Sequence, residues 1–286
     1  MRHLEKAFDQ AAAACQEDPV LFLPPVLMST VGAVLAALVG RELTRRILVP
    51  AVESPGLGFW PSVAALLPGF LLAAASLVLL SLLVGAGMQA LFVAVAEGRR
   101  PDLSTFWLGA GPFLLRYLGI NLLSALVRTA AGIVIGLGTV LGMLGGLASA
   151  GLSGLVAWGL VATLAGAAAG GVLRLLPPAH FLGGRPIWRA LDDGVRLLRR
   201  HPLPLLLLGG FAGGLAGNFQ ISNRFSGQMP PNRLAYELER LFRPDLLVTV
   251  VLVAATAAVV STFLGLTTYL LYQRLTAPDG VSEPPL

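Results

Sequence analysis

The chain has 286 residues, of which 56 % are hydrophobic and only 12 % are charged. A soluble domain carries about 25 % charged residues, so this composition excludes an ordinary soluble protein and predicts an integral membrane protein. The net charge of +5 comes from arginines scattered along the chain without interleaved aromatic residues. This pattern argues against nucleic acid as a partner and favours anionic lipid headgroups.

Six apolar runs are each long enough to cross a bilayer, which takes roughly 20 residues. In chain order they cover about 20–40, 62–95, 113–141, 152–182, 203–222 and 246–273. They leave no room for a separate soluble catalytic domain. The sequence therefore predicts an all-α fold, a polytopic six-helix transmembrane bundle that forms a single transmembrane domain over residues 1–286.

Three times a short amphipathic stretch runs into a proline and then into an apolar run, at Pro19, Pro112 and Pro202. The residue before a proline is disfavoured in the α region, so each proline is predicted to end a surface helix and redirect the chain. The pattern predicts three hairpins, each introduced by a cytoplasmic interfacial helix. The corresponding pseudo-repeat units are 1–97, 98–184 and 185–286.

The first and third units correspond at an offset of 183 residues, which places Asp9 on Asp192 and Pro19 on Pro202. The shared order of amphipathic helix, proline and apolar run supports a repeat more strongly than the few identities do. Because an even number of spans separates the two copies, the repeat is predicted to be parallel. Asp192 and Asp193 are predicted to pair with Arg196 on a solvated helix face.

The connection between the fourth and fifth spans has a recognisable pattern in the segments 176–181, 183–186, 190–191 and 197–202. This pattern resembles that of a widespread group of uncharacterised six-span bacterial integral membrane proteins, which includes the membrane domain attached to some glycerophosphodiester phosphodiesterases. Gly194 stands where such proteins often carry serine. The resemblance implies the six-span topology, and it implies no phosphodiesterase activity because the soluble catalytic domain is missing from these residues.

Enzymatic chemistry finds little support in the sequence. Gly151-Leu152-Ser153-Gly154 resembles the nucleophile motif of the six-span rhomboid proteases, but a serine nucleophile needs a nearby histidine. His3, His180 and His201 are all predicted near the cytoplasmic side, whereas Ser153 is predicted near the outer side. We therefore expect a small-residue loop there, no catalytic residues, no cofactor and no metal site.

One ionisable residue, Arg128, is predicted deep inside an apolar run. Tyr117, Asn121, Ser124 and Arg128 follow at i, i+4, i+7 and i+11, which predicts one polar stripe that faces the bundle. An intramembrane charge is a functional hypothesis by default, so the stripe is a candidate for contacting an anionic headgroup or solute. The alternative is a shifted span, in which Arg128 snorkels to the outer interface.

Glycines at four-residue spacing predict close helix packing within the monomer, with homodimerisation as a second interpretation. A further surface helix is predicted over 233–243, in the longest outer segment. The glycine pairs are 132 and 136, 138 and 142, 166 and 170, 209 and 213, and 210 and 214.

Arginine and lysine are more frequent in the segments that are cytoplasmic when the N-terminus is inside. The positive-inside rule therefore predicts a bacterial inner-membrane protein with both termini cytoplasmic. The predicted function is non-enzymatic interaction with membrane lipids or with a membrane protein partner, which includes a second copy of the chain. A small transporter or carrier for a lipid or anionic solute, using the stripe around Arg128, is the alternative.

Overall fold

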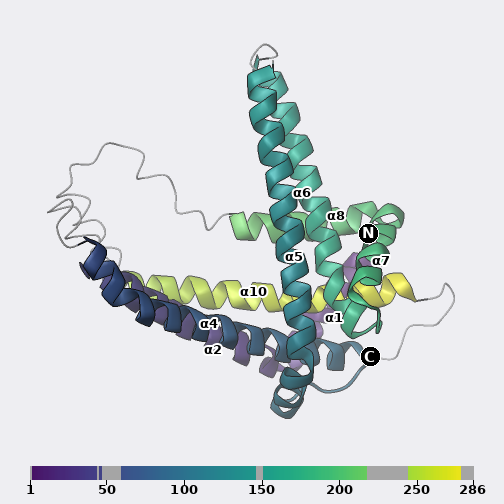
Figure 1. The fold of residues 1–286 in the computed structure, drawn as a ribbon. Coiled ribbons are helices and arrows are strands. Elements are labelled where there is room, and N and C mark those ends of the chain that lie inside the picture. Colours follow the sequence, from purple (N-terminus) through teal and green to yellow (C-terminus); the bar gives the residue numbers. More distant parts are fainter. Residues whose placement is uncertain (1, 44, 47–58, 146–150, 218–243, 278–286) are drawn as a thin grey trace. The chain divides into compact units, whose positions relative to one another are not determined.

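The computed structural model describes residues 2–43, 45–46, 59–145, 151–217 and 244–277 (Figure 1). Over these residues the chain is helical and contains no strand, which confirms the all-α prediction. The helices are α1 (Arg2–Glu17), the 3-10 helix η1 (Pro19–Leu21), α2 (Leu23–Leu43), α4 (Phe59–Ala96), α5 (Leu103–Gly145), α6 (Gly151–Phe181), α7 (Ile187–Arg200), α8 (Pro202–Gly217) and α10 (Pro244–Thr276).

Within the described ranges, five helical segments are long and apolar enough to cross a membrane. They are Pro19–Glu42, Leu67–Ala96, Leu103–Gly138, Ala157–Phe181 and Val248–Thr276. The sixth predicted span, 203–222, begins as α8, which is described for 16 residues and is about 24 Å long at 1.5 Å per residue. That length is short of a hydrocarbon core of about 30 Å, so the six-span count is not confirmed. The surface helix predicted over 233–243 lies outside the described residues.

Two compact units divide the chain. The first takes in the described residues within Met1–Asp18, Ala86–Gln220 and Phe263–Leu286, and the second those within Pro19–Gly85 and Ile221–Thr262. All the residues of the predicted polar stripe belong to the first unit, which also contains α6, α7 and α8.

The three prolines act differently. Pro19 and Pro202 confirm the prediction, because α1 ends at Glu17 before η1 and α7 ends at Arg200 before α8 begins at Pro202. The prediction for Pro112 was wrong, since α5 runs through it without interruption. A proline inside a helix removes the bond that its amide would donate to the carbonyl four residues back. Gly111 and Pro112 are exposed, so α5 passes this point at the cost of one backbone bond.

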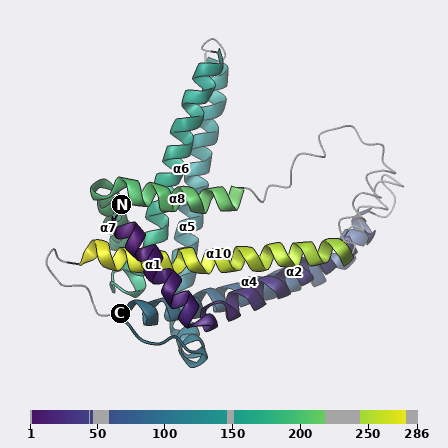
Figure 2. The same cartoon turned by 180° about the vertical axis from the view of Figure 1, so that it is seen from behind.

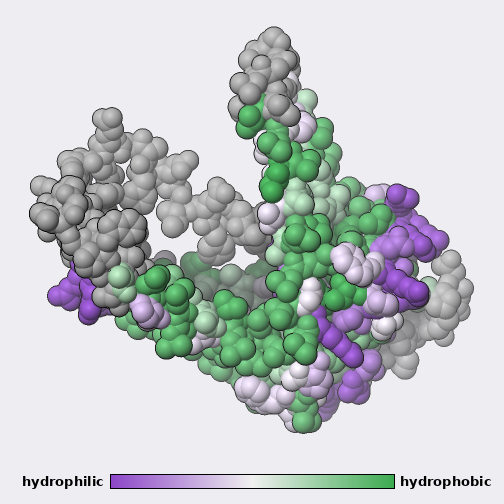
Figure 3. All heavy atoms as spheres, viewed as in Figure 1, coloured by the Kyte–Doolittle hydropathy of each residue, from purple (hydrophilic) through white to green (hydrophobic). Residues whose placement is uncertain are grey.

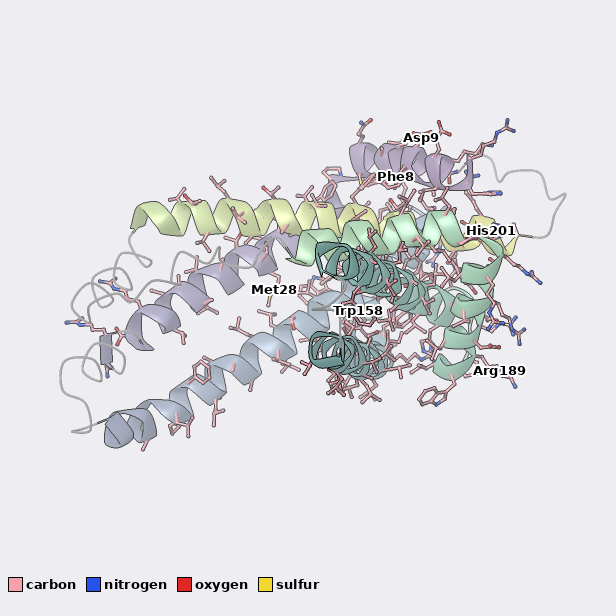
Figure 4. The ribbon with its side chains drawn as sticks, turned by 90° about the horizontal axis from the view of Figure 1, so that it is seen from above. Phe8, Asp9, Met28, Trp158, Arg189 and His201 are labelled. Atoms are coloured by element: carbon pink, nitrogen blue, oxygen red, sulfur yellow. The ribbon has the colours of Figure 1, made fainter. Side chains whose placement is uncertain are left out.

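The amphipathic helices α1 and α7 turn their apolar faces to the protein. Figure 2 shows α1 crossing α10. Phe8 of α1 packs on Phe263 of α10 with ring centroids 5.5 Å apart, and Asp9 points the other way (Figure 4). On α7 the buried residues are Ala190, Gly194 and Leu197, and a Cβ on Gly194 would lie 3.1 Å from Val172 Cγ1 of α6. Both predicted surface helices are confirmed as helices, and packing within the first unit covers their apolar sides.

Close helix contact in the first unit depends on glycine. α8 crosses α6 where Gly170 and Gly171 meet Leu205 and Gly209, and Figure 4 shows α8 lengthwise where α5 and α6 are seen nearly end-on. A Cβ on Gly209 would overlap the carbonyl oxygen of Ala167. The predicted packing role is therefore confirmed for Gly170 and Gly209. Three other paired glycines have no neighbour among the described residues within 4 Å of an added Cβ, namely Gly132, Gly136 and Gly166.

Aromatic rings fill the contacts between α4, α5 and α10 in the same unit. Gly87 of α4 lies against the ring of Phe106, and Gly265 of α10 lies against Phe92. Figure 3 shows apolar residues over α5 and α6 and charged residues gathered over α7. The polar surface and the apolar helices that carry the candidate site therefore belong to one packed unit.

Candidate functional site

The helices α5 and α6 run antiparallel, and two contacts fix their register. Phe113 stacks on Phe181 with ring centroids 4.7 Å apart, and Gly138 lies against the ring of Trp158. Successive residues of a helix are about 100° apart, so Phe113 and Gly138 lie within about 20° of each other around α5. Together they mark the side of α5 that faces α6.

How deeply each residue of the predicted stripe is buried follows from its angular distance, around the α5 axis, to the side that faces α6. Ser124 lies about 30° from it and is 8 % exposed, and Tyr117 lies about 50° from it and is half-buried. Arg128 and Asn121 lie about 70° and 90° away, and both are exposed on the protein surface. The Asn121 amide donates to the carbonyl oxygen of Tyr117 at 2.9 Å. The stripe therefore runs along the edge of the α5–α6 contact.

A second arginine joins the stripe from α6. Arg174 lies seven residues before Phe181, on the same side of α6, and Asn121 lies eight residues beyond Phe113. Because Phe113 and Phe181 are stacked, Arg174 and Asn121 lie at nearly the same level along the helix pair. Sequence reasoning missed Arg174 by assigning it to a cytoplasmic segment, although its spacing from the helix end was visible in the sequence.

Arg128 and Arg174 carry like charges on neighbouring helices, with their backbones about 10 Å apart along the helix axes. Within the described part of the chain, neither one forms an ion pair with a carboxylate. Arg174 is half-buried, which removes part of the water that would otherwise screen the two charges. Two unpaired cations on neighbouring helices attract an anion, and guanidinium groups bind carboxylate or phosphate oxygens in bidentate geometry.

A buried polar contact joins two other helices of the same unit. The hydroxyl of Tyr269, a residue that is 1 % exposed, donates to Gln89 Oε1 at 2.7 Å and joins α10 to α4. This bond fixes α10 and α4 relative to each other.

The protease-like motif does not meet a histidine on its own helix. Gly151 begins α6, so the predicted small-residue loop is wrong for residues 151–154, which form the first turns of that helix. Ser153 and His180 lie 27 residues apart on α6, about 40 Å at 1.5 Å per residue. His180 Nδ1 lies 2.6 Å from the carbonyl oxygen of Arg185, and its Nε2 is buried with no partner among the described residues.

The two aspartates of α7 form surface ion pairs. Arg196 pairs with Asp192 at 2.7 Å, as predicted, whereas Asp193 lies 3.7 Å from Arg185 instead. Among the described residues, no group of three or more His, Cys, Asp or Glu side chains is arranged to hold a metal ion. The paired arginines are therefore the strongest candidate site in this part of the chain.

The search for relatives gives no assignment. No protein family model, curated protein or solved structure matches the chain. The resemblance to six-span bacterial membrane proteins stays a prediction. The candidate site at Arg128 and Arg174 is the basis for the function proposed below.

Proposed function

We propose that the chain is a non-enzymatic, multi-pass protein of the bacterial inner membrane that binds an anionic group at Arg128 and Arg174. The observation that carries this proposal is the pair of arginines on the antiparallel helices α5 and α6, neither of which has a carboxylate partner among the described residues. An anion bound between them makes a charge-assisted contact with each.

Energetics favour an occupied site. A cationic side chain in an apolar spanning segment is unfavourable unless it snorkels to the headgroups or meets a counter-charge. Both arginines lie in helical segments long and apolar enough to span, Leu103–Gly138 and Ala157–Phe181. Asn121 and Ser124 add an amide and a hydroxyl at the same edge, and both groups can donate hydrogen bonds to an anion's oxygens.

The orientation is part of the proposal. Both termini are cytoplasmic, so α7 lies on the cytoplasmic side with its arginines. Cysteine-accessibility labelling in a Cys15→Ser background tests it. A thiol introduced at position 185 should react only from inside, and one at position 224 only from outside; the reverse labelling contradicts the orientation.

Ligand-induced stabilisation tests the binding proposal. A ligand at 100 times its Kd stabilises the folded state by about 2.7 kcal/mol, which raises the melting temperature measurably. We expect phosphatidylglycerol to stabilise the detergent-solubilised wild type, and to have little effect on Arg128→Gln or Arg174→Gln. Arg116→Gln is the matched control, because Arg116 is exposed on α5 away from the pair. Equal stabilisation of all four proteins would contradict the proposal.

A carrier for an anionic lipid or solute is the second candidate. Arg128 lies seven residues beyond Asn121 along α5, about 10 Å from the level of Arg174. A moving anion would therefore meet two cations at different depths. Flux of an anionic lipid or solute in proteoliposomes, abolished in a folded Arg128→Leu variant, supports this candidate, and unchanged flux in that variant removes it.

A further inference from the structure

We infer that the anion at this site is the phosphate of an anionic phospholipid, whose acyl chain lies over the open surface of α5 around Gly132, beyond Arg128. The inference rests on the proposed function and adds the class of ligand and its depth. Three features carry it: the place of α7 beside α6, the different depths of the two arginines, and the open surface next to them.

The position of α7 sets the depth of Arg174. Gly194 of α7 packs directly against Val172 of α6, two residues from Arg174. Asp192 and Arg196, on either side of Gly194, form an ion pair whose side chains are 58 % and 69 % exposed. Such a pair belongs in water or among headgroups and not in hydrocarbon. The part of α6 that carries Arg174 therefore lies at headgroup level, where phospholipid phosphates lie.

Arg128 reaches the same level from the apolar side. Its backbone lies about 10 Å further along the helix pair than Arg174, in the direction away from α7. Arginine snorkels, laying its aliphatic stem along apolar surface while its charged end stays with polar groups. Snorkelling of Arg128 brings its guanidinium group toward the level of Arg174, so a phosphate between the two arginines is held from above and below.

Beyond Arg128 the surface of α5 leaves room for an acyl chain. Gly132 follows Arg128 by one turn on α5 and is exposed. Among the described residues, no atom lies within 4 Å of a Cβ added to Gly132. A free phosphate or a small water-soluble anion makes no use of this surface, whereas the chain of a phospholipid covers it.

Titrations of the full chain in a non-ionic detergent distinguish the ligands. The probes are phosphatidylglycerol, phosphatidylcholine and inorganic phosphate, with binding followed by isothermal titration calorimetry. We expect phosphatidylglycerol to bind at least tenfold more tightly than phosphatidylcholine or phosphate. Arg128→Gln and Arg174→Gln each should weaken phosphatidylglycerol binding by about tenfold or more, since each removes a charge-assisted contact.

A glycine variant tests the acyl-chain surface. Gly132→Leu places a side chain on that surface, where an added Cβ meets no described atom within 4 Å, and it should weaken phosphatidylglycerol binding severalfold while leaving the fold intact. Gly32→Leu is the control, because Gly32 on α2 also has no neighbour within 4 Å of an added Cβ. The control should bind phosphatidylglycerol as the wild type does.

The outcomes separate the inference from the proposed function. If phosphate binds as tightly as phosphatidylglycerol and Gly132→Leu changes neither, the site takes an anion but the lipid inference is wrong. Equal binding of phosphatidylcholine and phosphatidylglycerol also overturns the lipid inference, because the net headgroup charge then plays no part. If no anionic probe binds the wild type, the proposed function itself fails.

Discussion

Replacing Gly209 with alanine is the sharpest test of packing in the unit that carries the site. A Cβ on Gly209 would overlap the carbonyl oxygen of Ala167 and lie 2.5 Å from the backbone nitrogen of Gly171. Both atoms belong to the α6 backbone, so no side-chain rotation relieves the overlap and α8 has to move away from α6. The adjacent Gly210 is the matched control, because its added Cβ would lie 4.0 Å from Ala167 Cβ, an ordinary contact.

The two substitutions are expected to change the free energy of unfolding in opposite directions. Overpacking a close contact costs about 1–3 kcal/mol of unfolding free energy. Gly210→Ala introduces no overlap and gains up to about 0.5–1 kcal/mol from the better helix propensity of alanine. The two variants should therefore differ by about 1.5–4 kcal/mol, with Gly209→Ala the less stable.

Reversible unfolding in mixed micelles, titrated with sodium dodecyl sulfate and followed by circular dichroism, measures this difference. Wild type, Gly209→Ala, Gly210→Ala and Gly132→Ala should be compared at equal protein concentration. Gly132→Ala serves as a second control on α5, where an added Cβ meets nothing within 4 Å. If Gly209→Ala unfolds together with Gly210→Ala, the close crossing of α6 and α8 is refuted.

Three further predictions concern the same unit. Tyr269→Phe leaves the buried Gln89 oxygen unsatisfied and should cost about 1 kcal/mol in the same titration, whereas the double variant Tyr269→Phe/Gln89→Met should cost less than the sum of the single changes. Asp102 caps the first turn of α5, and the hydrogen bonds that its carboxylate accepts from Thr105 and Ser104 hold its pKa below the ordinary value. The cap is therefore present above pH 3.8 and is lost only as the pH falls through the lowered pKa. Asp102→Ala should therefore raise hydrogen exchange in the first turn of α5 already at neutral pH, and equal exchange in variant and wild type would contradict the cap. Burial raises the pKa of the Cys15 thiol, so maleimide should label it severalfold more slowly in the folded protein than after unfolding, and equal rates would contradict a docked α1.

Hydropathy predicts the described spanning helices well, because a bilayer demands length and apolar composition that a linear sequence displays directly. The predicted span 152–182, for example, corresponds to α6 at Gly151–Phe181. The predicted break at Pro112 failed for a physical reason. A proline disfavours helix locally, but the long apolar helix around it continues at the cost of one backbone bond.

The site was predictable only in part. The helical period of 3.6 residues places Tyr117, Asn121, Ser124 and Arg128 on one stripe of α5. This prediction needs only the sequence of one helix. Whether another helix adds a charge depends on register, which here is fixed by the Phe113–Phe181 stack. No pattern along the chain displays that pairing, so Arg174 appears only when the helices are assembled.

The glycine spacing shows the same limit. It marked Gly170 and Gly209 as sites of close approach, but it did not show that they pack on each other across α6 and α8. It also marked Gly132 and Gly166, where the described residues place no neighbour within 4 Å. Spacing predicts which residues allow contact, and tertiary structure decides which of them make it.

The central claim is that Arg128 and Arg174 together hold an anionic group. Native mass spectrometry of the full chain, gently extracted from bacterial membranes, tests it most directly. The account predicts that the wild type and Arg116→Gln retain a bound anionic phospholipid, and that a folded Arg128→Gln/Arg174→Gln variant has lost it. A wild type that carries no anionic adduct, or a double variant that carries the same adduct as the wild type, would contradict the claim.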